Sequence, residues 1–166
     1  MLMDVPYNRS LALDYVNKWV FQYNPRYYNF DKIGGDCTNF ASQVLYAGCG
    51  TMNYSENGWF YNNVNHRSPS WCSVEFLYRF LINNKGCGPS GEQIDLKDLQ
   101  CGDLVQLSIK GERFEHSPVV VAVHHPISLA NVFVSTHSRD VHNYSLSHYK
   151  WADIRFIHID GAKKWC

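Results

Sequence analysis

The sequence predicts an α+β fold in which N-terminal helices pack on an antiparallel β-sheet. In the first half of the chain, apolar residues recur at the spacing of amphipathic helices. Beyond Gly88 the apolar residues instead form short β-branched runs bounded by turn residues. Helices that precede strands, rather than alternate with them, favour this class. At 166 residues and 45% hydrophobic content, the chain suits a single domain spanning 1–166.

Two helices are expected before residue 50. The first runs from Arg9 to about Tyr23 and ends at Asn24-Pro25. The second is the central helix, which begins directly after Gly34-Gly35-Asp36 and is expected to stop at Gly48, a residue suited to a left-handed helix cap.

The middle of the chain combines a long loop with a third helix. Residues Thr51 to Trp71 are rich in Asn, Ser and aromatic side chains without steady periodicity, which indicates an ordered loop with at most a turn of helix. The third helix is expected from Val74 to Ile82, with Ser70 or Ser73 as its N-terminal cap.

The second half of the chain is expected to form the sheet. Four apolar, β-branched runs are the predicted strands: Leu104–Leu107, Val119–Val123, Val132–Ser135 and Ile154–Ile159.

Composition excludes several functions and sets the expected compartment. Fifteen basic residues balance fifteen acidic ones without a basic block, which argues against nucleic-acid binding. No apolar run is long enough to span a membrane, and the N-terminus shows no signal peptide. We therefore expect a cytoplasmic protein, or one released by lysis or sporulation or cut from a longer precursor. The sequence leaves the oligomeric state open.

The cysteines and the absent motifs limit the choice of chemistry. The six cysteines, the last of them Cys166, contain no Cys-x-x-Cys pair, so free thiols are expected rather than a disulfide scaffold. No metal-binding or phosphate-binding motif is present, so neither a metal nor a nucleotide cofactor is expected.

Cys37 is the first candidate for chemistry. If Asp36 is the N-cap, Cys37 is the first helical residue, where free N–H groups and the helix dipole favour a thiolate. Helical spacing places it on the face turned toward the sheet. The Gly34-Gly35 pair lets a substrate backbone approach, and the Cys37 N–H can serve as an oxyanion donor. The alternative is a buried structural cysteine.

A nucleophilic cysteine needs a base, and strand geometry narrows the choice among eight histidines. His116 precedes one predicted strand and His137 follows the next. If these strands form a hairpin, residues 116 and 137 face each other, so His116 is expected to be the base and His137 the residue that orients it. A bulge would shift this register, which leaves Asp140 and Asn131 as alternative orienting residues.

The segment Gly34–Gln43 (GGDCTNFASQ) closely resembles the signature of the putative amidase domain family, a bacterial branch of papain-like cysteine hydrolases related to NlpC/P60 and CHAP domains. The resemblance extends from about residue 7 to residue 160. It differs at Cys101, where the family usually has glycine. Other matching segments include Leu99–Leu104, Glu115–Ser117 and Ser135–Ser138.

The resemblance implies a papain-like (NlpC/P60-type) fold and hydrolysis of an amide or peptide bond through a thioester. Cys37 would be the nucleophile, His116 the base and His137 the third, polar residue. The usual substrates of the wider clan are bacterial cell-wall peptides. Two alternatives remain open: a non-catalytic wall- or peptide-binding module on the same fold, and acyl transfer of the transglutaminase type.

Substrate contacts are expected from residues near the nucleophile and from the long loop. By analogy with related hydrolases, Tyr27 and Tyr28 are candidate oxyanion donors, and Asp36 lies next to the nucleophile. Trp59 and Trp71 in the long loop are candidates for a cleft wall, although they would serve equally well in the core.

Overall fold

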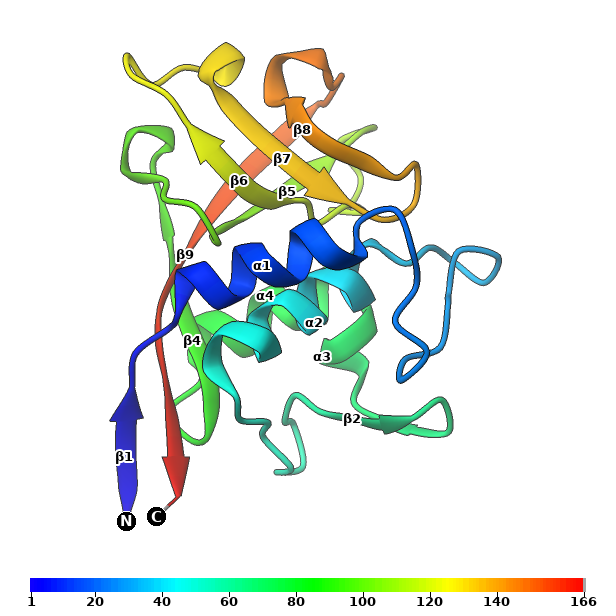
Figure 1. The fold of residues 1–166 in the computed structure, drawn as a ribbon, viewed down its shortest axis with the longest axis vertical. Coiled ribbons are helices and arrows are strands. Elements are labelled where there is room, and N and C mark those ends of the chain that lie inside the picture. Colours follow the sequence, from blue (N-terminus) through cyan, green and yellow to red (C-terminus); the bar gives the residue numbers. More distant parts are fainter. Residues whose placement is uncertain (166) are drawn as a thin grey trace.

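The structure, a computed structural model, describes residues 1–165 and is a mixed α/β fold with an antiparallel sheet and few helices. The predicted Cys166 thiol lies outside the described residues. Figure 1 shows the helices lying against the sheet, with the two chain ends side by side where β1 pairs with β9. Within residues 1–165, no helix has the length and apolar character needed to cross a membrane.

The sheet is antiparallel throughout its paired strands. The main sheet has seven strands. Six of them pair in the order β1-β9-β5-β6-β7-β8, and the seventh, β4, pairs with β9. A separate hairpin joins β2 (Tyr61–Asn63) to β3 (His66–Arg67). The strands of the main sheet are β1 (Leu2–Val5), β4 (Gly88–Ile94), β5 (Leu104–Ser108), β6 (Val119–Val123), β7 (Val132–Thr136), β8 (Val141–Ser145) and β9 (Asp153–Trp165).

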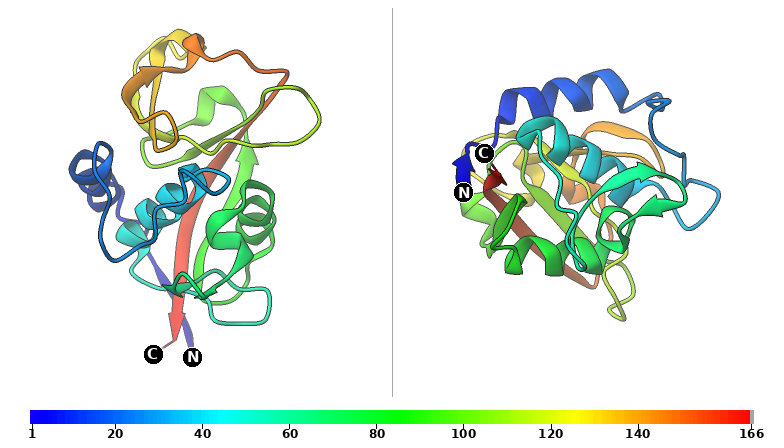
Figure 2. Two further views of the ribbon diagram at one scale, coloured as in Figure 1. Left: turned by 90° about the vertical axis from the view of Figure 1, so that its right-hand side faces the viewer. Right: turned by 90° about the horizontal axis from the view of Figure 1, so that it is seen from below.

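The helices are α1 (Arg9–Trp19), α2 (Cys37–Cys49), α3 (Pro69–Cys72) and α4 (Val74–Asn83). Both views in Figure 2 place α2 between α1 and α4, which confirms its central position. Short 3-10 helices cover Leu96–Asp98, Leu129–Asn131 and Leu146–His148.

The α1 helix is shorter than its apolar pattern predicts. It begins after Asn8, whose side-chain oxygen accepts the Leu11 N–H, and ends at Trp19 rather than near Tyr23. The Trp19 carbonyl accepts the Gln22 N–H at 3.2 Å in a turn and lies 2.8 Å from His137 Nε2. A long-range contact, which periodicity cannot reveal, therefore shares the carbonyl of the last helical residue.

The end of α2 also corrects the prediction, because Gly48 lies inside the helix. Gly50 is the left-handed cap, with φ of 68°. A Cβ on Gly48 would lie 2.1 Å from Cε2 of Tyr7, so this glycine is required by close packing rather than by its backbone angle.

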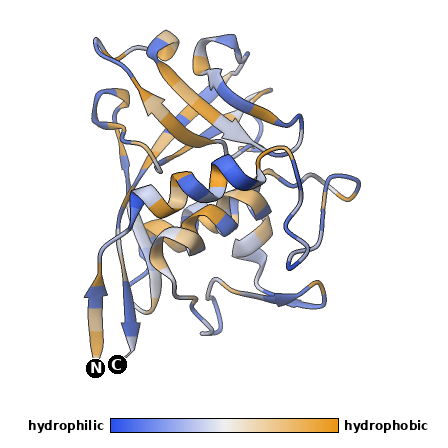
Figure 3. Cartoon of the chain, viewed as in Figure 1, coloured by the Kyte–Doolittle hydropathy of each residue, from blue (hydrophilic) through white to orange (hydrophobic). Residues whose placement is uncertain are grey.

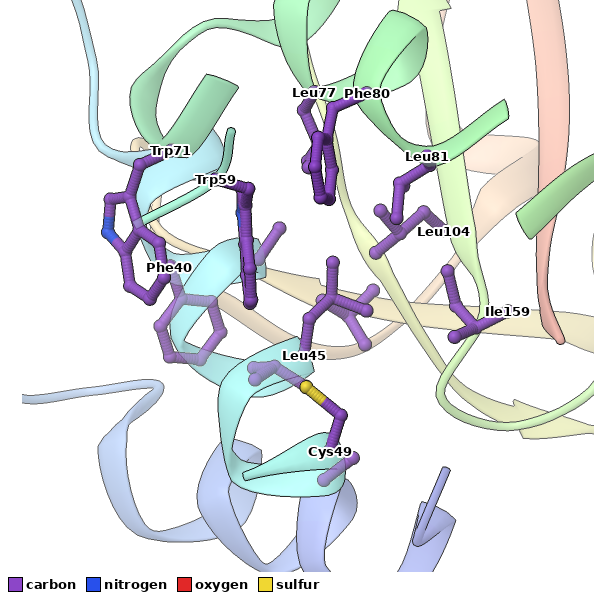
Figure 4. Close-up of a cluster of buried hydrophobic side chains, with 14 of the residues drawn as sticks. Phe40, Leu45, Cys49, Trp59, Trp71, Leu77, Phe80, Leu81, Leu104 and Ile159 are labelled. Atoms are coloured by element: carbon purple, nitrogen blue, oxygen red, sulfur yellow. The ribbon is translucent and has the colours of Figure 1, made fainter. Parts of the chain in front are cut away.

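The main hydrophobic core lies between the central helix, α4 and the sheet (Figure 4). Trp59 and Trp71 are both 0% exposed, and their ring centroids lie 4.6 Å apart. Ser42 Oγ accepts the indole N–H of Trp59 at 3.0 Å and donates to the Trp71 carbonyl at 2.9 Å. The structure therefore places both tryptophans in the core, which is the second of the two roles expected for them, rather than on a cleft wall.

The predicted strands are all present, and residues 1–165 contain five more, two of which, β2 and β3, lie in the segment expected to be a loop. Figure 3 shows β6 largely hydrophobic, in keeping with the run that predicted it, whereas α1 carries both hydrophobic and hydrophilic residues. The strands β1, β4 and β8 were not predicted. In β4 the sequence GPSGEQI lacks β-branched alternation, and its pairing along β9 supplies the order.

Candidate active site

Cys37 is the first residue of α2 and is 7% exposed. The preceding Gly34 and Gly35 adopt φ of 90° and 101°, in the left-handed region that glycine tolerates best. Asp36 occupies the N-cap position, but its side chain forms no capping hydrogen bond, which corrects the expected cap. Among the hydrogen bonds of residues 1–165, none is donated by the Cys37 N–H, so this group remains free to bind an oxyanion.

The Cys37 sulfur has polar neighbours. Sγ lies 3.8 Å from Thr38 Oγ1 and 3.9 Å from the carbonyl oxygen of Glu115, the residue before His116. Burial raises the pKa of the thiol, while hydrogen bonds with the Ser117 and Thr38 backbones and with the Thr38 side chain partly offset that rise. The resting group is therefore a neutral thiol rather than the thiolate expected from helix position alone.

The backbone of His116 is held next to β5. Its carbonyl accepts the Leu107 N–H at 3.1 Å, and Leu107 and His116 form an isolated β-bridge. The half-buried ring packs on Tyr149 at a centroid distance of 5.8 Å. Within residues 1–165 no hydrogen bond reaches either ring nitrogen, from Cys37 or from any other group. Both nitrogens are therefore available to exchange a proton.

The electrostatic surroundings keep His116 neutral. Burial, and after it the positive charge of Arg139, lowers the His116 pKa to about 4. Tyr149 interacts with both candidate residues, through its ring contact with His116 and through a charge interaction with Cys37. Burial raises the pKa of Tyr149 to about 12, and charges at Tyr144 and Cys37 contribute to the rise. At neutral pH the site therefore holds an uncharged thiol and an uncharged imidazole.

We expect an NMR titration of the His116 ring to give a pKa near 4 in the free protein, because burial disfavours the imidazolium. Arg139→Gln should raise that pKa, since it removes the neighbouring positive charge. Lys97→Gln, at an exposed site on the Leu96–Asp98 turn, should leave it unchanged. A His116 pKa near the ordinary value of about 6.5 in the wild type would contradict this electrostatic description.

The expected pairing of His116 with His137 across the hairpin is wrong by one residue. Val119 pairs with Ser135, a register that, if continued, would place residue 138 opposite 116. The register shifts between Val120 and Ala122, where a bulge adds a residue to one strand.

His137 instead lies beneath the start of α2 and is 1% exposed. Its Nδ1 is 2.7 Å from Asp36 Oδ2, and its Nε2 is 2.8 Å from the Trp19 carbonyl oxygen. The ring stacks on Phe40 at a centroid distance of 4.0 Å. Both ring nitrogens thus have partners, and neither partner is His116.

The hydrogen-bond partners of the His137 ring indicate its charge. The Trp19 carbonyl can only accept a hydrogen bond, and Asp36 Oδ1 already accepts bonds from Phe30 N–H (2.8 Å) and Asn39 Nδ2 (2.9 Å), as expected of a carboxylate. Both nitrogens of His137 therefore donate, so the ring is an imidazolium paired with a buried carboxylate. Burial alone would lower the His137 pKa, but the hydrogen bonds to Asp36 and Trp19 raise it overall.

The alternative orienting residues, Asn131 and Asp140, have other partners. Asn131 donates from Nδ2 to the Pro126 carbonyl at 2.8 Å, near the hairpin tip. Asp140 interacts electrostatically with His137, and burial raises its own pKa. Neither has a hydrogen bond to His116 within residues 1–165.

Of the expected substrate contacts, only Tyr28 presents an exposed ring, at 42% exposure. Its backbone is held by the Tyr61 hydroxyl, which accepts the Tyr28 N–H, and by Asn39, which donates to its carbonyl. Tyr27 packs in the core at 8% exposure, and Asp36 is 1% exposed, so its carboxylate is a structural partner rather than a substrate ligand.

Three contributors to the site were missed in the sequence: Ser138, Arg139 and Tyr149. Ser138 Oγ accepts the Asp36 N–H at 2.6 Å and donates to Asp31 Oδ1 at 2.9 Å, so the turn after β7 holds the loop before Cys37. Ser138 and Arg139 have φ of 61° and 69°, uncommon for residues other than glycine. Their only sequence signal was proximity to His137.

A cavity of about 560 Å³ opens beside His116 and is lined by Ser138, Arg139 and Tyr149 among others. We call it the His116 cavity. A larger cavity of about 980 Å³ lies between α4 and the loop around Asn53, and none of the predicted site residues lines it.

The described part of the chain contains no cluster of side chains suited to binding a metal ion. Among residues 1–165, no group of three or more His, Cys, Asp or Glu side chains could hold a metal ion. The five cysteines at positions 37, 49, 72, 87 and 101 are free thiols.

Comparison with known proteins gives a family match and one relative of note. A family model described as a putative amidase domain matches residues 6–159. The uncharacterized protein YhbB of Bacillus subtilis is 32% identical over 120 residues, which cover 70% of this chain and 37% of that protein. The match thus spans little more than a third of the relative's length. No solved structure matches significantly.

Proposed function

Because the chain belongs to the putative amidase domain family, we propose that it is a cysteine hydrolase that cleaves an amide or peptide bond through a thioester. The family suggests the reaction class. The observation that carries the chemistry is the position of Cys37 at a helix start, with its sulfur 3.9 Å from the carbonyl oxygen of the residue before His116. A cysteine hydrolase needs a base near its nucleophile, and this contact brings the main chain next to His116 to the Cys37 sulfur.

In the proposed reaction, His116 accepts the Cys37 thiol proton as the sulfur attacks the carbonyl carbon and forms a C–S bond. The Cys37 N–H donates to the oxyanion. Collapse of this intermediate breaks the C–N bond, and His116 returns the proton to the departing amine. Water then attacks the thioester, again losing a proton to His116, and releases a carboxylic acid and the free thiol.

The resting geometry is consistent with proton transfer that begins only when substrate binds. Both groups are neutral, and no hydrogen bond joins them within residues 1–165. Catalytic hydrogen bonds in free enzymes are often long and tighten in the substrate complex. The mechanism requires the Cys37 sulfur and a His116 ring nitrogen to come within hydrogen-bond distance in the substrate complex.

In this proposal His137 is a positioning residue. It acts through Asp36, which directly precedes the nucleophile, rather than through the His116 ring. We propose that the fold is of the papain-like class, because the candidate nucleophile starts a helix and the candidate base lies beside β5 of an antiparallel sheet. Bacterial cell-wall peptides are the proposed substrates.

Product analysis in ¹⁸O-labelled water tests the proposed reaction. Peptidoglycan fragments incubated with the protein should yield a new amine and a carboxylic acid that carries one ¹⁸O atom. Added hydroxylamine should intercept the thioester as a hydroxamate. Transfer of the acyl group to an added amine, with little ¹⁸O uptake, would favour acyl transfer instead, and intact fragments after prolonged incubation would count against this substrate class.

A further inference from the structure

Three chain segments that are far apart in the sequence meet around the His116 cavity. Glu115 and His116 come from the segment before β6, Arg139 from the turn after β7, and Tyr149 and Lys150 from the segment that follows β8. Its volume of about 560 Å³ lies in the range typical of small-molecule pockets. The lining includes the proposed base but not Cys37, whose sulfur lies 3.9 Å from the carbonyl oxygen of Glu115, a residue that does line the cavity. A group bound in the cavity therefore lies beside the base.

The charges that line the cavity are not balanced within the chain. Arg139 and Lys150 have no ion pair or side-chain hydrogen bond within residues 1–165, and neither does Glu115, the one carboxylate in the lining. Two cations against one carboxylate leave an excess of positive charge. Arg139 also holds φ of 69°, a costly backbone conformation of the kind that gathers at ligand sites.

We infer that the His116 cavity binds a carboxylate group of the substrate, so that the amide cleaved is in an acidic peptide, with Arg139 and Lys150 as the recognising residues. This inference rests on the proposed function. A guanidinium and an ammonium are the side chains that bind carboxylates most strongly, and the arginine can do so through two parallel hydrogen bonds.

Carboxylate binding would also activate the base. The charge of Arg139 disfavours a proton on His116, so an anion paired with Arg139 reduces that effect and raises the basicity of the ring. The imidazole would become a better proton acceptor only when the correct substrate is present. Binding and proton transfer are thereby coupled through one arginine.

The test compares alkylation of Cys37 by iodoacetate and iodoacetamide, with the modified cysteine located by peptide mass spectrometry. Both reagents form an S–C bond and release iodide, but only iodoacetate carries a carboxylate. Arg139 and Lys150 are exposed, so Arg139→Gln and Lys150→Gln should each lower the iodoacetate-to-iodoacetamide rate ratio at Cys37 by about two- to fivefold, as expected for exposed charge pairs.

The control is Lys97→Gln, which removes an exposed cation outside the cavity and should leave the ratio unchanged. An unchanged ratio in the Arg139→Gln/Lys150→Gln double variant would overturn the inference. Because the ratio is taken within each variant, a general change in thiol reactivity cancels.

A second measurement separates this inference from the proposed nucleophile. If neither reagent modifies Cys37, the proposed nucleophile is contradicted, and the cavity is then tested alone. N-acetylglycine should raise the NMR-measured pKa of His116, whereas the uncharged N-acetylglycinamide should not. Equal effects of the two compounds would overturn carboxylate binding.

Discussion

Cys37→Ala should lose amide-hydrolysing activity by about a thousandfold or more, because a covalent mechanism has no alternative nucleophile at this position. The protein should remain folded. The Cys37 side chain is small, and its sulfur makes only weak contacts at 3.8 and 3.9 Å. The measurement is turnover of peptidoglycan fragments, with circular dichroism and thermal unfolding recorded in parallel.

Cys87→Ala is the matched control. Cys87 is also a partly buried free thiol, but it lies in the loop before β4 and lines the larger cavity instead of the candidate site. Its removal should leave turnover within about twofold of the wild type, the small change usual for substitutions away from a site. Turnover by Cys37→Ala equal to that of the wild type would contradict the mechanism, although the chain would still belong to the family.

His116→Gln provides the second half of this test. Glutamine occupies a similar volume and cannot act as a base at neutral pH, so turnover should fall steeply although the thiol remains. Removal of either member of a nucleophile–base pair typically costs nearly as much as removal of both. The Cys37→Ala/His116→Gln double variant should therefore be little slower than either single variant.

The elements with strong local patterns were predictable, and those ordered by pairing were not. The run Val119–Val123 is strand β6 with the same bounds, because consecutive β-branched residues favour the extended backbone locally. The strand β4 begins with Gly88 and Pro89 and owes its order to the partner strand β9. Nothing within β4 itself carries that information.

The candidate site divides in the same way. Helix position identified Cys37 as the start of α2, because the signals are local: two glycines, an acidic residue and an apolar helical pattern. The partner of His137 lies 101 residues away, and β6 and β7 pair in a register one residue away from the one on which the pairing with His116 depended. Long-range polar contacts of this kind require the folded structure.

His137→Gln should destabilise the protein by about 3–5 kcal/mol, the range found when one partner of a buried ion pair is removed. Glutamine can donate to only one of the two acceptors that His137 satisfies. The Asp36 carboxylate, 1% exposed, would remain charged without its counterion, or the Trp19 carbonyl would lose one of its two donors and keep only the Gln22 N–H. Chemical denaturation at pH 6 measures this loss, with His66→Gln on the exposed strand β3 as the control.

Asp36→Asn should cost less than His137→Gln. A neutral His137 could accept a hydrogen bond from the new amide at Nδ1 and still donate from Nε2 to the Trp19 carbonyl. The double variant should show strong non-additivity, because the two residues share one interaction. Additive losses in the three variants would contradict a coupled ion pair.

The pH dependence of the same variants identifies the charged state. The His137 pKa is raised in the folded protein, so the folded state binds more protons than the unfolded state at pH values above about 6.5. The stability contributed by the pair is therefore complete below that pH and is lost as pH rises through the folded pKa. His116, whose pKa is lowered to about 4, acts in the opposite sense, since its contribution is lost as pH falls from about 6.5 toward 4.

Subtracting the unfolding free energy of His137→Gln from that of the wild type at each pH cancels the contribution of His116 and isolates the pair. The difference should be largest below about pH 6.5 and should shrink at higher pH. A difference that grows with pH would mean that His137 is neutral in the folded protein. Neutral hydrogen bonds would then hold the start of α2, and no buried ion pair between Asp36 and His137 would position Cys37.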